Sequence, residues 1–359
     1  MTEITDARAV REEDAFDVAR VSEWLAAHAT DPSGMQGVPE VRQFSGGASN
    51  LTFLLRWPER DVVVRRAPRG TKAAGAHDMG REFRLQSALA GHFDYVPRMV
   101  AHCTDDAVMG AEFYAMDRLD GVVPRSDWPA DVPLSPEKAR ALCLRSVSVL
   151  AELHAVDPDA AGLTSLGKGH GYVQRQVEGW TMRYRNARTP DVPDCEDVMA
   201  WLAARQPDDV ATCVIHNDFK LDNLVLDRAD VTAVLGVLDW ELATLGDPLM
   251  DLACSMAYWV QADDPEDFQM VRRVPTHLPG MLTRAEVVAE YARLTGRSVT
   301  PEQWRFYEVY GLFRLAGIAQ QIYYRYFHGQ TTNEAYAIFG PAVQIVARRL
   351  TELIGQEEG

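Results

Sequence analysis

Short, mostly apolar runs with β-branched and aromatic residues mark the first third of the chain, and such runs between turn residues are typical of β-strands. The runs that predict strands cover residues 41–44, 51–57, 62–65 and 113–118. Gly46-Gly47 and residues 58–61 supply the turns between the first three strands. A small antiparallel sheet is therefore expected here, and Gly121, just after the last strand, suits a hinge.

Helical spacing of apolar residues predicts helices over 13–29 and 79–92, and helices dominate from Ser135 onward. Ser135-Pro136-Glu137 supplies an N-cap, a proline at the first helical position and an early acid. The expected fold class is α+β with two lobes and a cleft between them. We divide the chain into an N-terminal helical extension (1–36), a small lobe (37–118) and a helical lobe (119–359).

The composition narrows the class of protein further. The 359 residues are 47% hydrophobic and carry a net charge of −16, which argues against a nucleic-acid partner because phosphates require a basic footprint. No apolar run approaches the length that spans a bilayer, and the acidic start is unlike a signal peptide, so we expect a cytoplasmic protein without a membrane partner. Five scattered cysteines favour reduced structural thiols over a zinc site. Without a heptad pattern, a monomer is the default, with a dimer as the alternative.

Two segments carry the candidate chemistry, residues 216–223 (HNDFKLDN) and residues 238–241 (LDWE). Phosphoryl transfer requires a carboxylate that accepts the hydroxyl proton, and Asp218 is the candidate. Asn223 and Asp239 offer the oxygen ligands that Mg²⁺ prefers. Residues 224–226 and 231–238 predict a hairpin, turning over 227–230, that would bring Asn223 and Asp239 side by side. The alternative is that these polar residues only cap and turn the loop.

The same segments resemble the catalytic and metal-binding loops of the aminoglycoside phosphotransferase-like (APH/choline kinase-type) family. The closer resemblance is to the phosphotransferase-like domain associated with acyl-CoA dehydrogenases, through four further stretches at residues 44–52, 63–66, 246–253 and 314–318. The resemblance implies a bilobal protein-kinase-like fold, with ATP (or GTP) and Mg²⁺ as cofactors. In such families the position of His216 supports the loop, and Lys220 would place positive charge near the transferring phosphate. A solvated Lys220 is the alternative.

The candidate nucleotide-binding residues lie upstream. A turn between two strands contains Gly46, Gly47, Ser49 and Asn50. Its glycines allow the backbone to approach a phosphate closely. The alternative for this turn is an ordinary hairpin.

Kinases use a cation on the third strand, held by an acid of the next helix, and Arg65 and Glu82 occupy those places. Arginine instead of the usual lysine departs from the common pattern, although the resemblance to the acyl-CoA-dehydrogenase-associated domains includes it. Arg66, Arg69 or Lys72 are alternatives for this cation. Met116, Asp117 and Leu119 are expected to form the hinge that contacts the adenine.

The acceptor site has the weakest signal. Our candidates are Trp180, Glu241, Tyr258 and Tyr323, among other aromatic and polar residues of the helical region. Acids could attract an amine-bearing acceptor, whereas arginines and tyrosines could hold an anionic one. The resemblance favours a hydroxyacyl or other small hydroxylated metabolite over an aminoglycoside.

Three functions therefore compete at this point. The first is a small-molecule kinase that phosphorylates a hydroxyl group. The second is a catalytically silent nucleotide- or metabolite-binding module, motivated by Arg65 in place of lysine. The third, a metal-dependent phosphohydrolase, lacks the dense set of His and Asp ligands that two-metal hydrolysis favours.

Overall fold

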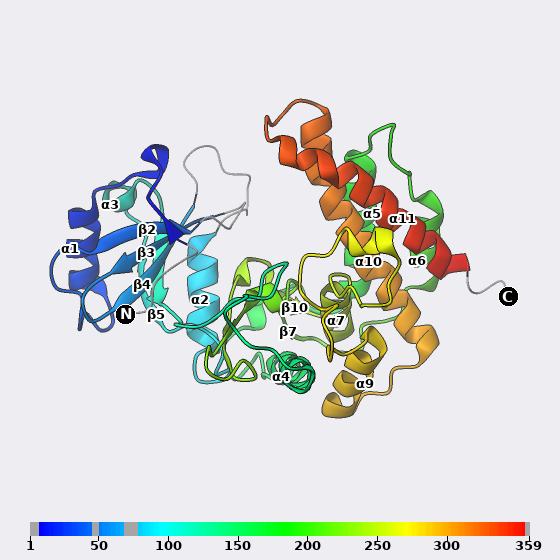
Figure 1. Ribbon diagram of the computed structural model, residues 1–359, viewed down its shortest axis with the longest axis horizontal. Coiled ribbons are helices and arrows are strands. Elements are labelled where there is room, and N and C mark those ends of the chain that lie inside the picture. The colour runs from blue at the N-terminus through cyan, green and yellow to red at the C-terminus, as the bar shows by residue number, and fades with distance from the viewer. Residues whose placement is uncertain (1–6, 45–49, 68–77, 356–359) are drawn as a thin grey trace. The chain divides into compact units, whose positions relative to one another are not determined.

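The computed structural model describes residues 7–44, 50–67 and 78–355 (Figure 1). The chain separates into two compact units, Met1–Asp120 and Gly121–Gly359. Gly46, Gly47, Ser49, Arg69 and Lys72 lie outside the described residues.

The N-terminal unit is built on one antiparallel sheet with the strand order β1-β2-β3-β4-β6-β5. Its strands are β1 (Ala7–Arg8), β2 (Glu40–Phe44), β3 (Leu51–Arg56), β4 (Asp61–Arg66), β5 (Met99–Cys103) and β6 (Phe113–Asp117). Its helices are η1 (Glu12–Asp14), α1 (Val18–His28), α2 (Met79–Leu89) and α3 (Asp106–Met109).

Both faces of this sheet are covered because side chains along a strand point alternately to opposite sides. On β4, Val62 and Val64 enter the core that includes Val21 and Leu25 of α1. Val63, between them, enters a second cluster with Met79 of α2, Met116 and Tyr114. Helices α1 and α2 thus cover opposite faces (Figure 1).

The C-terminal unit is mainly helical. Its α-helices are α4 (Pro136–His154), α5 (Tyr172–Asn186), α6 (Glu196–Arg205), α7 (Pro248–Met256), α8 (Glu266–Gln269), α9 (Arg284–Thr295), α10 (Pro301–Phe327) and α11 (Phe339–Gly355). Short elements between them are η2 (Thr164–Leu166), β7 (Cys213–Ile215), η3 (Leu221–Asn223), β8 (Leu224–Leu226), β9 (Val234–Val237), η4 (Trp240–Leu242), β10 (Thr244–Gly246) and η5 (Glu334–Ile338). Strand β7 pairs with β10, and β8 pairs with β9, both antiparallel.

The predicted α+β, kinase-like fold class is confirmed, and several local signals act as expected. Ser135 caps α4 through Lys138 N, with Pro136 in the first turn. Asp247 caps α7 by accepting from two backbone N–H groups. Helix α1 begins at Val18 rather than at residue 13, because Asp17 caps it and a 3₁₀ turn precedes that cap.

The sequence prediction also had gaps. It omitted β1, β5, β7 and β10, and it began the second hairpin strand at residue 231 rather than 234. All five cysteines are free and buried. Within residues 7–44, 50–67 and 78–355, no helix combines the length and apolar character needed to cross a bilayer.

Helix α10 packs against α7 at Gly311, where backbone meets backbone. A Cβ added at Gly311 would lie 2.3 Å from the carbonyl oxygen of Ala253. We therefore expect Gly311→Ala to lower the free energy of unfolding by about 1–3 kcal/mol, since a packed backbone cannot move aside cheaply. Urea denaturation followed by circular dichroism measures the change.

The matched control is Gly179→Ala in α5, where the added Cβ meets only the flexible end of Arg183. This variant should be unchanged, or more stable by about 0.5–1 kcal/mol, because alanine favours the helix. Equal stability of the two variants would contradict the close approach of α10 and α7.

Candidate active site

In the N-terminal unit, Arg65 and Glu82 form the ion pair that the sequence suggested. Arg65 extends from β4 to within 3.3 Å of Glu82 on α2, and only 2% of the Glu82 side chain is exposed. The Glu82 carboxylate also accepts from the Tyr114 hydroxyl at 2.9 Å and from the Asn50 amide at 3.3 Å. Such a network fixes the direction of the Arg65 guanidinium, which is the arrangement a phosphate-binding cation requires.

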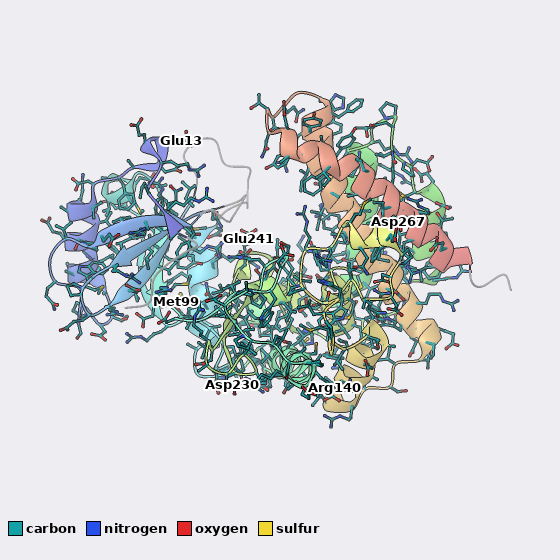
Figure 2. All side chains as sticks on the ribbon, in the orientation of Figure 1. Glu13, Met99, Arg140, Asp230, Glu241 and Asp267 are labelled. Atoms are coloured by element: carbon teal, nitrogen blue, oxygen red, sulfur yellow. The ribbon has the colours of Figure 1, made fainter. Side chains whose placement is uncertain are left out.

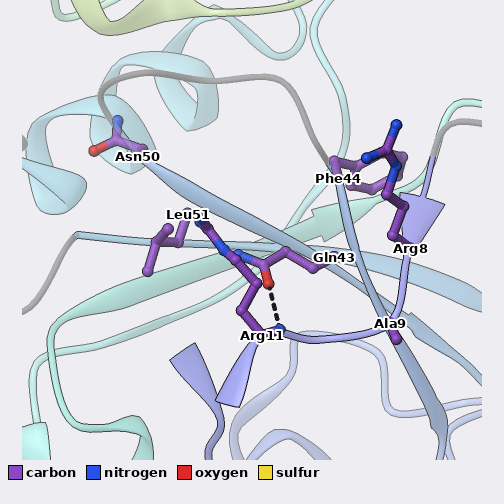
Figure 3. Close-up of a pocket in the computed structure, with 7 residues that line it drawn as sticks. All are labelled: Arg8, Ala9, Arg11, Gln43, Phe44, Asn50 and Leu51. Atoms are coloured by element: carbon purple, nitrogen blue, oxygen red, sulfur yellow. Dashed lines mark hydrogen bonds between the residues drawn. The ribbon is translucent and has the colours of Figure 1, made fainter. Parts of the chain in front are cut away.

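Asn50 is the one predicted residue of the glycine turn that lies among the described residues. It lines a cavity of about 360 Å³, together with Arg8, Ala9, Arg11, Gln43, Phe44 and Leu51 (Figure 3). Gln43 Oε1 accepts from the backbone N–H of Arg11 there, and the Arg11 guanidinium is already paired with Asp14 at 2.8 Å. The polar groups of Gln43 and Arg11 in this cavity therefore mainly attach the N-terminal segment to the sheet.

The predicted hinge lies at the end of β6. Met116 is buried beside Val63, consistent with core filling behind the hinge. The backbone N–H of Asp117 donates to the carbonyl of Arg98 at 2.9 Å, and the Asp117 carboxylate accepts from Arg60 and Arg98. A purine contact at Asp117 would therefore use its carbonyl oxygen and not its N–H, whereas Leu119 is half-buried.

In the C-terminal unit, a buried carboxylate holds the start of the 216–223 loop. Asp251 of α7 accepts from the backbone N–H groups of His216 and Asn217, both at 2.7 Å, and from His154 Nε2 at 3.0 Å. Burial acts to raise the pKa of Asp251, but the hydrogen bonds from the His154 side chain and the His216 backbone, with the electrostatic effect of the two imidazoles, outweigh it and leave the pKa lowered. Asp251 thus organises the start of this loop.

Asn217 and His216 give the loop its shape. Asn217 has φ +64°, a left-handed conformation in which asparagine is enriched. Its side chain accepts from the Tyr172 hydroxyl at 2.9 Å and donates to the carbonyl of Leu242 at 3.0 Å. His216 Nε2 donates to the carbonyl of Leu238 at 3.0 Å, and its Nδ1 accepts from the N–H of Asp218 at 3.2 Å. Burial lowers the pKa of His216, which keeps the ring neutral as this pattern requires.

Asp218, Lys220 and Asn223 lie in direct contact. Asp218 Oδ2 accepts from Lys220 Nζ at 2.8 Å and from Asn223 Nδ2 at 3.0 Å. Asn223 Nδ2 also donates to the backbone carbonyl of Asp218 at 2.8 Å. Because both bonds use the amide nitrogen, the Asn223 amide oxygen is oriented away from Asp218 and suits a cation.

Asp230, labelled in Figure 2, lies in the turn of the β8–β9 hairpin. The pairing of this hairpin brings the Asp239 segment alongside Asn223. Leu224 pairs with Val237, and the N–H of Leu238 donates to the carbonyl of Asn223 at 2.8 Å. Asp239 follows with φ +66°, an uncommon conformation for a residue other than glycine. Glu241 lies two residues further, in η4.

Lys220 balances two acids. Its ammonium lies 2.8 Å from Asp218 Oδ2 and 3.2 Å from Asp222 Oδ1. Burial opposes the charged ammonium, but the two carboxylates outweigh it and raise the pKa of Lys220. Burial is also the main cause that raises the pKa of Asp222. Lys220 is therefore not a solvated surface lysine, because only 13% of its side chain is exposed.

Among the acceptor candidates, Tyr258 and Trp180 lie near this loop and Tyr323 does not. Lys220 Nζ lies 5.7 Å from the centre of the Tyr258 ring. Trp180 connects to the loop through Arg314, which contacts its ring and donates to the Asn217 carbonyl at 2.9 Å. Tyr323 lies nine residues beyond Arg314 on α10, about 14 Å along the helix, and donates to Asp191 instead.

The sequence analysis missed His154, Asp222 and Arg314 as parts of the site. Asp222 lies inside the motif, two residues after Lys220, so its spacing was a usable signal. His154 and Arg314 are separated from their partners by 97 residues in each case, and only the fold reveals them.

The donor set around Asn223 and Asp239 fits Mg²⁺. One amide oxygen and one carboxylate are hard ligands, and Mg²⁺ commonly takes one or two carboxylates and completes its shell with water and substrate phosphates. Across the part of the chain that the structure describes, no three His, Cys, Asp or Glu side chains gather to hold a metal by themselves.

This chain belongs to the phosphotransferase enzyme family, whose model matches residues 40–297. It is 36% identical over 313 residues to acyl-CoA dehydrogenase family member 10 of Mus musculus. The matched region covers 86% of this chain and 28% of the mouse protein. The chain spans less than half the length of the curated relatives it matches.

Solved structures agree with this assignment. A protein of Ralstonia eutropha JMP134, provisionally assigned as an aminoglycoside phosphotransferase, superposes with a TM-score of 0.80 at 33% identity, covering 95% of this chain and 99% of that chain. The aminoglycoside phosphotransferase APH(4)-Ia, in a ternary complex with ADP and hygromycin B, has a TM-score of 0.56 at 16% identity, covering 93% of this chain and 98% of that chain. The second likeness concerns the fold alone.

Removing the Asp251 carboxylate should release the loop and destabilise the C-terminal unit. Asp251→Ala leaves two backbone N–H groups and His154 without their acceptor, so we expect a loss of about 3–5 kcal/mol in the free energy of unfolding. Urea denaturation of the protein measures it.

Asp263→Ala, which removes an exposed acid that accepts a hydrogen bond from Gln261, is the matched control and should change stability by less than about 0.5 kcal/mol. If the two variants unfold at the same urea concentration, Asp251 does not anchor the loop.

Proposed function

We propose that this protein is a kinase that transfers the γ-phosphate of ATP or GTP to the hydroxyl group of a small molecule. The observation that carries the proposal is the contact set of Asp218, Lys220 and Asn223, with the Asp239 segment bonded alongside. Family membership supports the same reaction class.

In this proposal Asp218 accepts the proton of the acceptor hydroxyl as the acceptor oxygen attacks the γ-phosphorus. The bond between the γ-phosphorus and the β,γ-bridging oxygen breaks, and the nucleoside diphosphate leaves. Mg²⁺ held by Asn223 and Asp239 would neutralise charge on the β- and γ-phosphate oxygens. Lys220, already 2.8 Å from Asp218, supplies positive charge close to the reacting group. In the N-terminal unit, Arg65 acts as the phosphate-binding cation. The Met116–Leu119 segment contacts the adenine ring.

For the acceptor, we favour a hydroxyacyl or other small hydroxylated metabolite over an aminoglycoside. The support is the 36% identity to a protein named as an acyl-CoA dehydrogenase family member, compared with 16% to an enzyme crystallised with hygromycin B. Tyr258 and Trp180 are the candidate acceptor contacts because of their links to the catalytic loop.

The second candidate function is a catalytically silent module that binds a nucleotide or metabolite. Arg65 in place of lysine motivates it, since a guanidinium is broader than an ammonium and places its charge differently. The Arg65–Glu82 contact at 3.3 Å counts against it, because the arginine keeps the acid partner that a functional cation has.

Replacing the proposed base tests the reaction directly. Asp218→Asn should lower kcat by about a hundredfold to ten-thousandfold with little change in nucleotide affinity, because only the proton acceptor is lost. Nucleotide consumption in the presence of Mg²⁺, over a panel of hydroxylated metabolites, gives the rates.

Asp230→Asn, at the turn of the same hairpin, removes an equal charge and should keep the native rate. Native protein that binds Mg-nucleotide but shows no acceptor-dependent turnover above Asp218→Asn would favour the silent module.

Replacing the proposed metal ligand tests the cofactor. Asp239→Asn tolerates the left-handed backbone at φ +66° but loses the anionic oxygen. We expect the Mg²⁺ concentration that gives half-maximal activity to rise at least about tenfold. An unchanged Mg²⁺ requirement, measured by titrating the metal at saturating nucleotide, would place the metal elsewhere.

A further inference from the structure

Two guanidinium groups flank one indole ring in the C-terminal unit. The guanidinium carbon of Arg183 lies 4.8 Å from the centre of the Trp180 ring, and that of Arg314 lies 5.4 Å from it. The indole is held against α10 at Gly317, where a Cβ would approach it to 2.9 Å. Trp180, Arg183 and Arg314 together are called the arginine–tryptophan cluster below.

This cluster adjoins the catalytic loop. Arg314 Nη2 donates at 2.9 Å to the carbonyl of Asn217, the residue immediately before Asp218. The charge on Arg314 also reaches Tyr258, whose ring faces Lys220. Burial and then the charge on Asp218 raise the pKa of Tyr258 to about 12, against the opposing charges of Arg314 and Lys220.

Neither arginine of the cluster forms an ion pair with an acid among the described residues, although the charge on Asp218 acts on Arg314. Within residues 7–44, 50–67 and 78–355, Arg183 and Arg314 form no ion pair, whereas Arg185, two residues further on α5, is paired with Glu196. Arg314 is buried, with 5% of its surface exposed, while Arg183 is exposed. Two cations on one ring repel each other unless an anion neutralises them, and this arrangement is unusual in a chain with a net charge of −16.

We propose that the arginine–tryptophan cluster binds an anionic group, a carboxylate or a phosphate, carried by the phosphate acceptor. The inference rests on the proposed kinase function and narrows its substrate to an anionic hydroxylated metabolite. Arg183 contacts the anion, since a guanidinium matches carboxylate and phosphate oxygens in a bidentate manner. Trp180 orients Arg183. Arg314, which also contacts the Trp180 ring, does not touch the anion but adds positive electrostatic potential at the site. A polycationic aminoglycoside meets repulsion at this position.

The test compares anionic acceptors with neutral counterparts of the same shape. For the carboxylate, hydroxybutyrate and hydroxyoctanoate are compared with their methyl esters. For the phosphate, hydroxybutyryl phosphopantetheine is compared with hydroxybutyryl pantetheine. The native protein should phosphorylate one anionic series with a KM about tenfold to hundredfold below that of its neutral counterpart, and the preferred series identifies the source of the anion.

Arg183→Ala should remove that preference by raising KM for the anionic acceptor, while KM for Mg-nucleotide and kcat stay close to native. Arg183→Lys should restore part of the affinity, since it keeps the charge but not the bidentate geometry. Arg185→Ala, which removes one exposed positive charge from the same helix, is the matched control and should leave the acceptor KM unchanged.

Calorimetric binding of the same probes separates this inference from the kinase proposal. Anion binding that Arg183→Ala abolishes, without any turnover, supports the cluster and overturns the kinase function. Turnover that prefers neutral or cationic acceptors, or identical behaviour of Arg183→Ala and Arg185→Ala, overturns the cluster and leaves the kinase function intact. Absence of both anion binding and turnover overturns both.

Discussion

The geometry of the site depends on the Asp251 carboxylate, which accepts hydrogen bonds from two consecutive backbone N–H groups at His216 and Asn217. A carboxylate buried to this degree requires compensation, and those N–H groups together with His154 supply it. From the other side, Arg314 of α10 holds the Asn217 carbonyl. Residues on α4, α7 and α10 therefore fix a two-residue segment, and Asp218 follows from it in one orientation. Positions held in this way are preorganised, which is what electrostatic catalysis requires.

The contacts within the loop could be anticipated from the sequence because their signals are local. The spacing of Asp218 and Asn223, the hairpin after them and the capping residues Ser135 and Asp247 all act within a few residues of one another, and the structure brings the paired groups together. The strands that the sequence did not reveal, such as β7 and β10, have three residues each, too few to establish a period of two.

Long-range partners could not be predicted for a different reason. Arg314 is one of many arginines, and nothing near it in the sequence marks it as the partner of Asn217. The same holds for His154 and Asp251. Tyr323 illustrates the converse, since its residue type suggested an acceptor contact but its position along α10 places it by Asp191. Residue type proposes candidates for a site, whereas the packing of helices decides which of them meet.

The central claim is that Asn223 and Asp239 together hold a divalent cation beside Asp218. Anomalous diffraction from crystals grown with Mn²⁺ and a non-hydrolysable nucleotide tests it most directly, because Mn²⁺ replaces Mg²⁺ and can be located by its own scattering. The account predicts a single strong peak at roughly 2.0–2.3 Å from the Asn223 amide oxygen and from an Asp239 carboxylate oxygen. A peak coordinated by other side chains, or nucleotide bound with neither residue at the metal, would contradict it.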